Sequence, residues 1–167
     1  WNDWKWQMSK RITDVETLAK IIELSEDEYD IILDIQKRYR WAISPYYASL
    51  MHPHDRSCPV RWLAVPSAFE YSEEGELDPM AETETSPVPA ITRRYPDRLI
   101  VKVTNQCAMY CRHCQRRRQI GEIDRHTTEE RLQEAIKYIK ENPEIRDVLI
   151  TGGDAFMLED ELIEWLL

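Results

Sequence analysis

The chain has 167 residues, which is long enough for one domain with a hydrophobic core, or for one small domain and part of another. Its 31 acidic and 22 basic side chains give a net charge of −9, which disfavours broad nucleic-acid binding, because that binding depends on excess Lys and Arg. No apolar stretch approaches the roughly 18 residues that cross a bilayer, and the start does not resemble a secretory signal. We therefore expect a cytoplasmic protein that binds neither membranes nor nucleic acid.

Both ends of the sequence suggest a fragment of a longer protein. The chain begins at Trp1 without an initiating Met, and it ends on an apolar helical run, 162–167, that reaches no cap.

The first 45 residues are expected to form a helical region. Thr13 with Glu16, and Ser25 with Glu28, have the spacing of capping boxes, in which a hydroxyl and a carboxylate satisfy the first amides of a helix. The apolar stripes that follow comprise Val15, Leu18, Ile21 and Ile22 in the first helix, and Tyr29, Ile32, Leu33 and Ile35 in the second. Residues 46–97 hold most of the prolines and an acidic segment, which predicts an irregular connection that wraps over another domain.

From residue 98 onward the pattern is that of an α/β fold. The β-branched run 99–104 and the run 147–151 predict two buried strands, and a helix between them is expected to begin at Thr127 with Glu130 and to stop at Asn142. Another helical pattern occupies 158–167. This order predicts the first strands of a partial parallel (β/α) barrel over 98–167, with functional sites at the carboxyl ends of the strands.

Three cysteines follow the first predicted strand directly. Cys107, Cys111 and Cys114 have the CxxxCxxC spacing that fits three thiolate ligands of a [4Fe–4S] cluster, with one iron left open for catalysis. A structural zinc site is the alternative, but it requires four ligands and only His113 is near. Packing as small hydrophobic residues is a weaker alternative, because arginines surround the cysteines.

Glycines and arginines mark two further candidate sites. Gly152 and Gly153 follow the second predicted strand, where the lack of Cβ atoms lets a ligand approach the backbone, and Asp154 adds an anionic acceptor. A plain turn with a helix cap is the alternative for these three residues. Four arginines beside the cysteines could bind an anionic cofactor or a substrate carboxylate, or could form a solvated loop; they are Arg112, Arg116, Arg117 and Arg118.

The cysteine spacing resembles the signature of the radical S-adenosylmethionine (SAM) enzymes. That resemblance implies that SAM chelates the open iron and that its reductive cleavage yields a 5′-deoxyadenosyl radical. It also implies that His113 lies against the adenine and that Gly152, Gly153 and Asp154 meet the SAM amino group. The alternative for His113 is a solvated histidine in the loop.

Longer stretches resemble a specific family within that superfamily. The segments SPVPAITRRYPDRLIVKVTNQCAMYCRHCQRRR, ISPYYASLMHP and IRDVLITGGDA closely resemble the lysine 2,3-aminomutase family, which includes glutamate 2,3-aminomutase. The resemblance implies an isomerase that moves an amino group from the α to the β carbon of an amino acid, with SAM, a [4Fe–4S] cluster and pyridoxal 5′-phosphate (PLP) as cofactors. We expect the full-length protein to be a homo-oligomer.

The family's functional residues can be assigned by their positions in these motifs. The resemblance implies that Arg94, Tyr95 and Arg98 surround PLP and that Arg116 holds the substrate α-carboxylate. The lysine that binds PLP, and the residues that distinguish a lysine from a glutamate side chain, would lie beyond residue 167, so Lys102, Lys137 and Lys140 are not assigned that role.

The substrate stays open between lysine and glutamate, although Gln115 and the run RYRWAISPYY look closer to the glutamate branch. Two other functions stay as alternatives. One is a radical SAM enzyme that works without PLP on a protein lysine, and the other is a metal-stabilised RNA-binding module.

Overall fold

The computed structural model describes residues 1–167 and divides them into two compact units. The first unit comprises Trp1–Glu74 together with Ala108–Cys114, and the second comprises Gly75–Cys107 together with Gln115–Leu167. The divisions expected at residues 45 and 97 therefore fall inside the first and the second unit respectively. None of the helices has both the length and the apolar composition that spanning a membrane requires.

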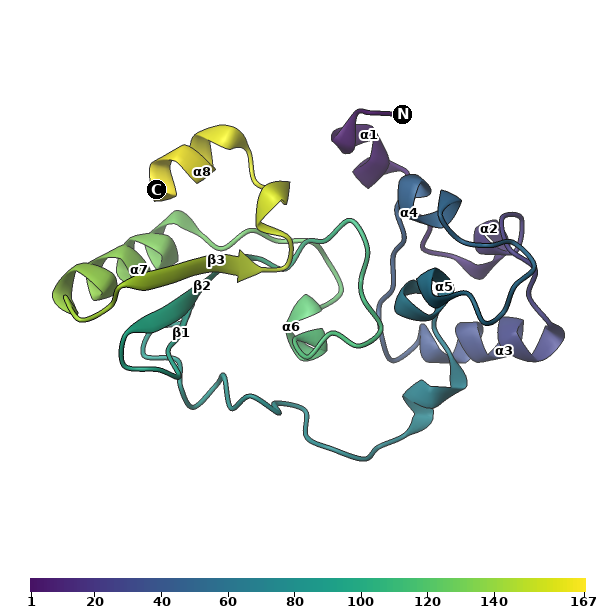
Figure 1. Ribbon diagram of the computed structural model, residues 1–167, viewed down its shortest axis with the longest axis horizontal. Coiled ribbons are helices and arrows are strands. Elements are labelled where there is room, and N and C mark those ends of the chain that lie inside the picture. Colours follow the sequence, from purple (N-terminus) through teal and green to yellow (C-terminus); the bar gives the residue numbers. More distant parts are fainter. The chain divides into compact units, whose positions relative to one another are not determined.

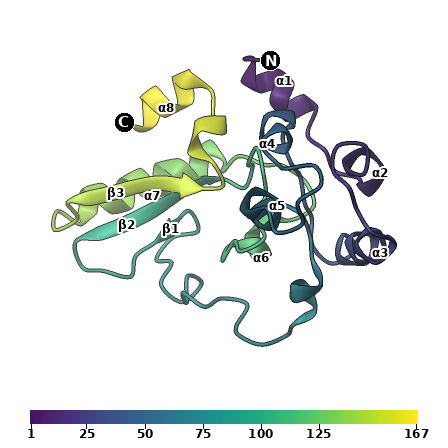
Figure 2. The same ribbon diagram turned by 45° about the vertical axis from the view of Figure 1, so that its right-hand side comes forward.

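The first unit is built from short helices (Figure 1). They are α1 (Trp4–Ser9), α2 (Val15–Leu18), α3 (Glu26–Ile35), α4 (Pro45–Ser49), α5 (Pro59–Ala64) and the 3-10 helix η1 (Ala68–Tyr71). Figure 2 shows α2 next to α3, and both contribute to one buried cluster. Its members are Ile12, Val15, Leu18, Ile22, Ile32, Trp41, Ile43, Ala48, Met51 and Ala64.

Only one of the two capping boxes expected in this unit forms. Ser25 caps α3, because its hydroxyl accepts from the Glu28 amide while the Glu28 carboxylate accepts from the Ser25 amide at 2.8 Å. The expectation for Thr13 is wrong, since Asp14 is the N-cap of α2 and its carboxylate accepts from the Thr17 amide at 2.7 Å. The helix therefore begins one residue later than expected, and the capped amide is that of Thr17 rather than that of Glu16.

The second unit contains a three-stranded sheet with the order β1-β2-β3 (Figure 1). Its strands are β1 (Ile91–Thr92), β2 (Arg98–Thr104) and β3 (Asp147–Gly152). Its helices are α6 (Arg117–Ile120), α7 (Glu129–Glu141), the 3-10 helix η2 (Ala155–Met157) and α8 (Asp160–Leu166). Strands β2 and β3 are parallel and joined through α7, which confirms the expected α/β order, whereas the antiparallel β1 is too short to have been found from sequence.

Helices α7 and α8 pack against one face of this sheet. The buried cluster on that face comprises Ala90, Ile91, Leu99, Val101, Val103, Leu132, Ala135 and Leu158. Because side chains alternate along a strand, Ile100 and Lys102 point to the opposite face of β2. The N-cap of α7 is Thr128 rather than Thr127. The Thr127 hydroxyl instead donates to the Lys102 carbonyl at 2.7 Å.

Candidate functional site

The cysteine loop is divided between the two units. Cys107 lies in the second unit, directly after the end of β2, whereas Cys111 and Cys114 lie in the first. All three are partly exposed and none forms a disulfide, and no group of three or more His, Cys, Asp or Glu side chains is arranged to hold a metal ion. The ligand role of the three cysteines therefore stays a prediction.

Residues between the cysteines anchor the loop in the first unit. Tyr110 is 1% exposed, its amide donates to the Ala42 carbonyl at 3.1 Å, and the Arg40 guanidinium lies 4.8 Å from its ring centroid. Met109 packs against the buried cluster of this unit. Packing of Met109 and Tyr110 therefore fixes the backbone just before Cys111.

A buried ion pair fixes the other side of Cys111. The Arg112 side chain is 8% exposed and that of Glu70 is 6% exposed. Arg112 Nε donates to Glu70 Oε1 at 2.9 Å, and its Nη2 donates to Oε2 at 2.5 Å. Its Nη1 also donates to the Arg40 carbonyl at 3.2 Å. Arg112 is thus engaged within the protein, and of the four arginines it is the one least suited to bind an external anion.

The two cysteines of the first unit have properties that fit metal ligation. The Cys114 amide donates to the Cys111 carbonyl at 3.1 Å, so one tight turn carries both residues. Burial, and then the neighbouring Cys114, raise the pKa of the Cys111 thiol. The raised pKa means that ionising Cys111 is unfavourable without a nearby positive charge. A bound metal cation supplies that charge and stabilises the thiolate, which is the ligand that iron–sulfur clusters use. His113, between them, is exposed and able to face a ligand.

The glycine pair has a role in packing that sequence reasoning missed. Gly152 has φ +122°, and a Cβ on it would collide with the Thr104 carbonyl oxygen. A Cβ on Gly153 would collide with the Gln106 carbonyl oxygen. The space was expected to admit a ligand, but backbone of the loop after β2 fills it. The two loops are joined by bonds from the Gly153 amide to the Thr104 carbonyl and from the Asp154 amide to the Gln106 carbonyl, at 2.5 and 2.8 Å.

Asp154 acts as a cap in this structure. Its carboxylate accepts from the Phe156 amide at 3.1 Å at the start of η2. This is the turn-and-cap alternative considered from the sequence, and the side chain remains partly exposed. The role of residues 152–154 in binding SAM stays a prediction.

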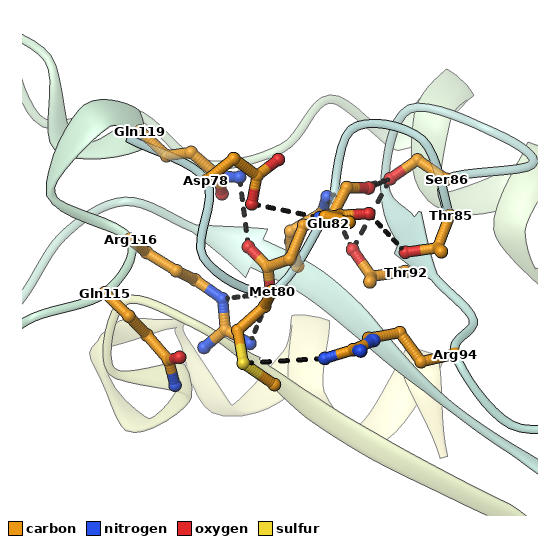
Figure 3. Close-up of polar contacts among 12 residues, drawn as sticks. Asp78, Met80, Glu82, Thr85, Ser86, Thr92, Arg94, Gln115, Arg116 and Gln119 are labelled. Atoms are coloured by element: carbon orange, nitrogen blue, oxygen red, sulfur yellow. Dashed lines mark hydrogen bonds and ion pairs between the residues drawn. The ribbon is translucent and has the colours of Figure 1, made fainter. Parts of the chain in front are cut away.

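Arg116 belongs to a polar cluster centred on Glu82 (Figure 3). The Glu82 side chain is 4% exposed, and its Oε1 accepts from Nε of Arg116 and lies 2.9 Å from Nη2. Gln119 Nε2 donates to Glu82 Oε2 at 3.3 Å. Glu82 therefore holds one edge of the Arg116 guanidinium and leaves Nη1 for another acceptor.

Arg118 binds a second carboxylate of the same segment. Its Nη2 lies 2.7 Å from Asp78 Oδ2 and 3.6 Å from Glu82 Oε2. Burial alone would raise the pKa of Asp78, but hydrogen bonds from the Thr83 and Glu82 amides and the charge of Arg118 outweigh it and lower the pKa to about 2. Asp78 is therefore ionised at neutral pH.

The residues expected around PLP lie at the amino end of β2. Arg98 begins the strand, its guanidinium lies 5.5 Å from the Tyr95 ring centroid, and its Nε donates to Asp97 at 3.2 Å. Arg94 is exposed, and its Nη1 lies 3.5 Å from Met80 Sδ (Figure 3). Arg98 and Thr104 are the first and last residues of β2, so a strand length of about 20 Å, at roughly 3.3 Å per residue, separates Arg98 from the end where the cysteine loop begins. Tyr95 and Arg98 are brought together, and their role in binding PLP stays a prediction.

Three site residues were not found from the sequence. Glu70, Asp78 and Glu82 come from the segment expected to be an irregular wrapping connection, and Glu82 and Glu70 are the buried partners of the arginines around the cysteines. A signal was present, because a run of arginines that is partly buried needs acidic partners, and 73–84 is an acidic segment.

Comparisons with known proteins agree with the motifs. The model of the radical SAM superfamily matches residues 101–167. A glutamate 2,3-aminomutase of Clostridioides difficile (strain 630) is 57% identical over 168 residues, which cover all of this chain and 40% of the relative. L-lysine 2,3-aminomutases of Clostridium subterminale and Bacillus subtilis (strain 168) are 46% and 47% identical over 169 residues, all of this chain and 41% and 36% of the relatives.

The chain thus spans about two fifths of the length of the curated relatives it matches. A match to the radical SAM superfamily implies a [4Fe–4S] cluster and SAM as cofactors, and the likeness to the aminomutases extends along the whole chain. The cysteine spacing, the α/β order of the second unit and the comparisons agree: the chain is similar along its whole length to members of the lysine 2,3-aminomutase family, and residues 101–167 match the radical SAM superfamily.

Proposed function

We propose that the protein is an amino acid 2,3-aminomutase, an isomerase that moves the amino group of a small-molecule substrate from the α to the β carbon. The observation that carries this proposal is the identity of 57% and 46% to a glutamate and a lysine 2,3-aminomutase along the entire chain. When bound, the cluster and SAM supply a 5′-deoxyadenosyl radical and PLP stabilises the migrating nitrogen.

The chain's own residues would bind and orient these groups. Cys107, Cys111 and Cys114 would hold the cluster, with Cys111 kept in place by the buried neighbours on either side of it. His113 and the backbone of residues 152–154 would contact SAM, and Arg94, Tyr95 and Arg98 would contact PLP. Arg116 would hold the substrate α-carboxylate through Nη1, because Glu82 already binds its other edge.

Glutamate is the substrate that we favour over lysine. The glutamate aminomutase relative is 57% identical to this chain, whereas the lysine aminomutases of Clostridium subterminale and Bacillus subtilis are 46% and 47% identical. Over the same aligned length, a difference of about ten percentage points supports the glutamate branch.

The test uses the protein expressed from the complete gene and purified without oxygen. After reconstitution with iron and sulfide and addition of PLP, SAM and dithionite, we expect 5′-deoxyadenosine and the β-amino isomer of L-glutamate, both measured by mass spectrometry. Cys111→Ser should abolish both products, because the cluster would lose one of its three ligands. Cys58→Ser is the matched control, since Cys58 is a buried thiol outside the triplet, and it should retain both products.

Two results would contradict the proposal. A protein that takes up zinc and no iron would lack the cluster on which the chemistry depends. SAM cleavage without PLP absorbance, and without isomerisation of either amino acid, would instead favour a PLP-independent radical SAM enzyme that acts on a protein lysine.

A further inference from the structure

Lys102 is a partly buried cation without a carboxylate partner. It lies within β2, and its Nζ donates to the Thr92 hydroxyl at 3.0 Å and to the Ser86 hydroxyl at 3.4 Å. No ion pair joins it to Asp or Glu, and burial lowers the pKa of its ammonium group. The Ser86 hydroxyl itself donates to the Glu82 carbonyl at 2.6 Å. The third N–H of Lys102 is thus left for an acceptor that the protein does not supply.

The charges around Lys102 do not balance. The charged groups that act on it are Glu82, Asp78, Arg116 and Arg118. Both carboxylates are already paired, Glu82 with Arg116 and Asp78 with Arg118, at 2.9 and 2.7 Å. Two anions therefore face three cations, and Lys102 is the cation that remains. A partly desolvated charge is costly unless an opposite charge approaches it, so this group favours an anionic ligand.

The position of Lys102 suits a substrate. It points to the face of β2 opposite the cluster beneath α7 and α8, and it lies two residues before the carboxyl end of the strand, opposite Thr151 of β3. Ligands of parallel α/β folds bind at this end of the strands. Lys102 donates to the Ser86 hydroxyl. Glu82 links that hydroxyl to Arg116, since its carbonyl accepts from Ser86 and its carboxylate accepts from Arg116; Figure 3 shows Ser86, Glu82 and Arg116.

We propose that Lys102 is a second anion-binding residue of the substrate site and holds the side-chain carboxylate of a dicarboxylic amino acid whose α-carboxylate is bound by Arg116. This inference rests on the proposed function, which supplies the role of Arg116. Lys102 would then be a determinant of substrate choice within this chain, in addition to the residues expected beyond residue 167. An ammonium substrate side chain would instead meet a cation here and would be repelled.

The test compares L-glutamate with its neutral isostere L-glutamine. In the holoenzyme from the complete gene, Lys102→Met should lower the preference in kcat/KM for glutamate over glutamine about 10- to 100-fold, the loss expected for one hydrogen bond to a charged group. Lys102→Arg keeps the charge and should retain most of the preference. Lys140→Met, on the exposed side of α7, removes an equal charge elsewhere and should leave it unchanged.

Equilibrium binding provides a measurement that does not depend on turnover. Calorimetric titration with each amino acid should show weaker binding of glutamate, but not of glutamine, to Lys102→Met, with circular dichroism confirming that the variant is folded. If the wild-type protein binds glutamate through Lys102 but forms no β-amino product, the proposed function fails and the inference stands.

Two outcomes would overturn the inference. One is an unchanged preference for glutamate in the Lys102→Met variant, in both rate and binding. The other is a loss of PLP affinity in that variant, measured by absorbance titration, with the preference intact, which would make Lys102 a ligand of the cofactor phosphate.

Discussion

At the scale of single residues, the carboxylate of Glu82 determines the orientation of Arg116. It is nearly inaccessible, and its Oε1 faces both Nε and Nη2 of one guanidinium. Breaking a buried ion pair costs more than forming it gains, because the remaining charge stays desolvated. Glu82, which was identified only from the structure, therefore orients Arg116, the residue that the family motif assigns to the substrate.

Glu82→Gln should lower the free energy of unfolding by about 3 kcal/mol, because Arg116 would lose its buried counter-charge. Denaturation by urea, followed by tryptophan fluorescence, measures this change. Glu84→Gln is the matched control two residues away, and its exposed side chain predicts a change within about 0.5 kcal/mol. Equal unfolding midpoints for the two variants would contradict the structural role given to Glu82.

At the scale of elements, the loop of three cysteines depends on anchors that are not cysteines. Segment 108–114 is attached to the first unit by the ring of Tyr110 and by the pair of Arg112 with Glu70. Residues adjacent to the proposed ligands thus define the path of the backbone, and ligand geometry depends on them as well as on the thiols.

Arg112→Met should destabilise the protein by about 3 to 5 kcal/mol and reduce the iron bound per chain, since the buried Glu70 carboxylate would lose the Arg112 guanidinium as its counter-charge. Adding Glu70→Met removes that carboxylate, and we expect the double variant to recover part of the stability. Arg131→Met, on exposed α7, controls for loss of an arginine. Chemical denaturation and iron analysis measure both effects, and strictly additive losses in the double variant would show that the two side chains do not interact.

The turn that begins at Asp78 predicts a specific dependence on acid. The pKa of Asp78 is about 2 in the folded protein, below the ordinary 3.8, so its ionised form stabilises the fold above pH 4 and that contribution is lost as the pH falls towards 2. Asp78→Asn should therefore be less stable than the wild type at neutral pH, and its stability should fall less steeply between pH 4 and pH 2. Acid titration followed by circular dichroism tests this, and parallel curves would contradict it.

At the scale of the whole molecule, β3 presents an apolar edge. It pairs with β2 along one side, and Leu149 is 62% exposed and Val148 is 41% exposed. Exposed strand edges with apolar side chains favour association between copies. The polypeptide 1–167 expressed by itself should self-associate in sedimentation velocity, and Leu149→Lys should reduce that association. A stable monomer for the unsubstituted polypeptide would be the contrary result.

Local signals explain which parts of the molecule were predictable. The strands β2 and β3, the helix α7 and the cap at Ser25 each arise from a few neighbouring residues, so the sequence pattern predicts them. The cap at Thr13 failed because the adjacent Asp14 is also a favourable N-cap residue, and the helix begins after it. The pairs of Glu82 with Arg116 and of Glu70 with Arg112 join residues more than thirty positions apart, and periodicity contains no information about such partners.

The close approach at Gly152 and Gly153 means that the spacing of two loops is set by the backbone and not by the side chains proposed to select the substrate. The loops that follow β2 and β3 are tied together by peptide groups, so their spacing is insensitive to exchange of the side chains around them. The charges that would select a substrate belong instead to Lys102, Arg116 and their partners. If the proposed function holds, we expect mutation at Lys102 to change the substrate preference without changing the spacing of the two loops.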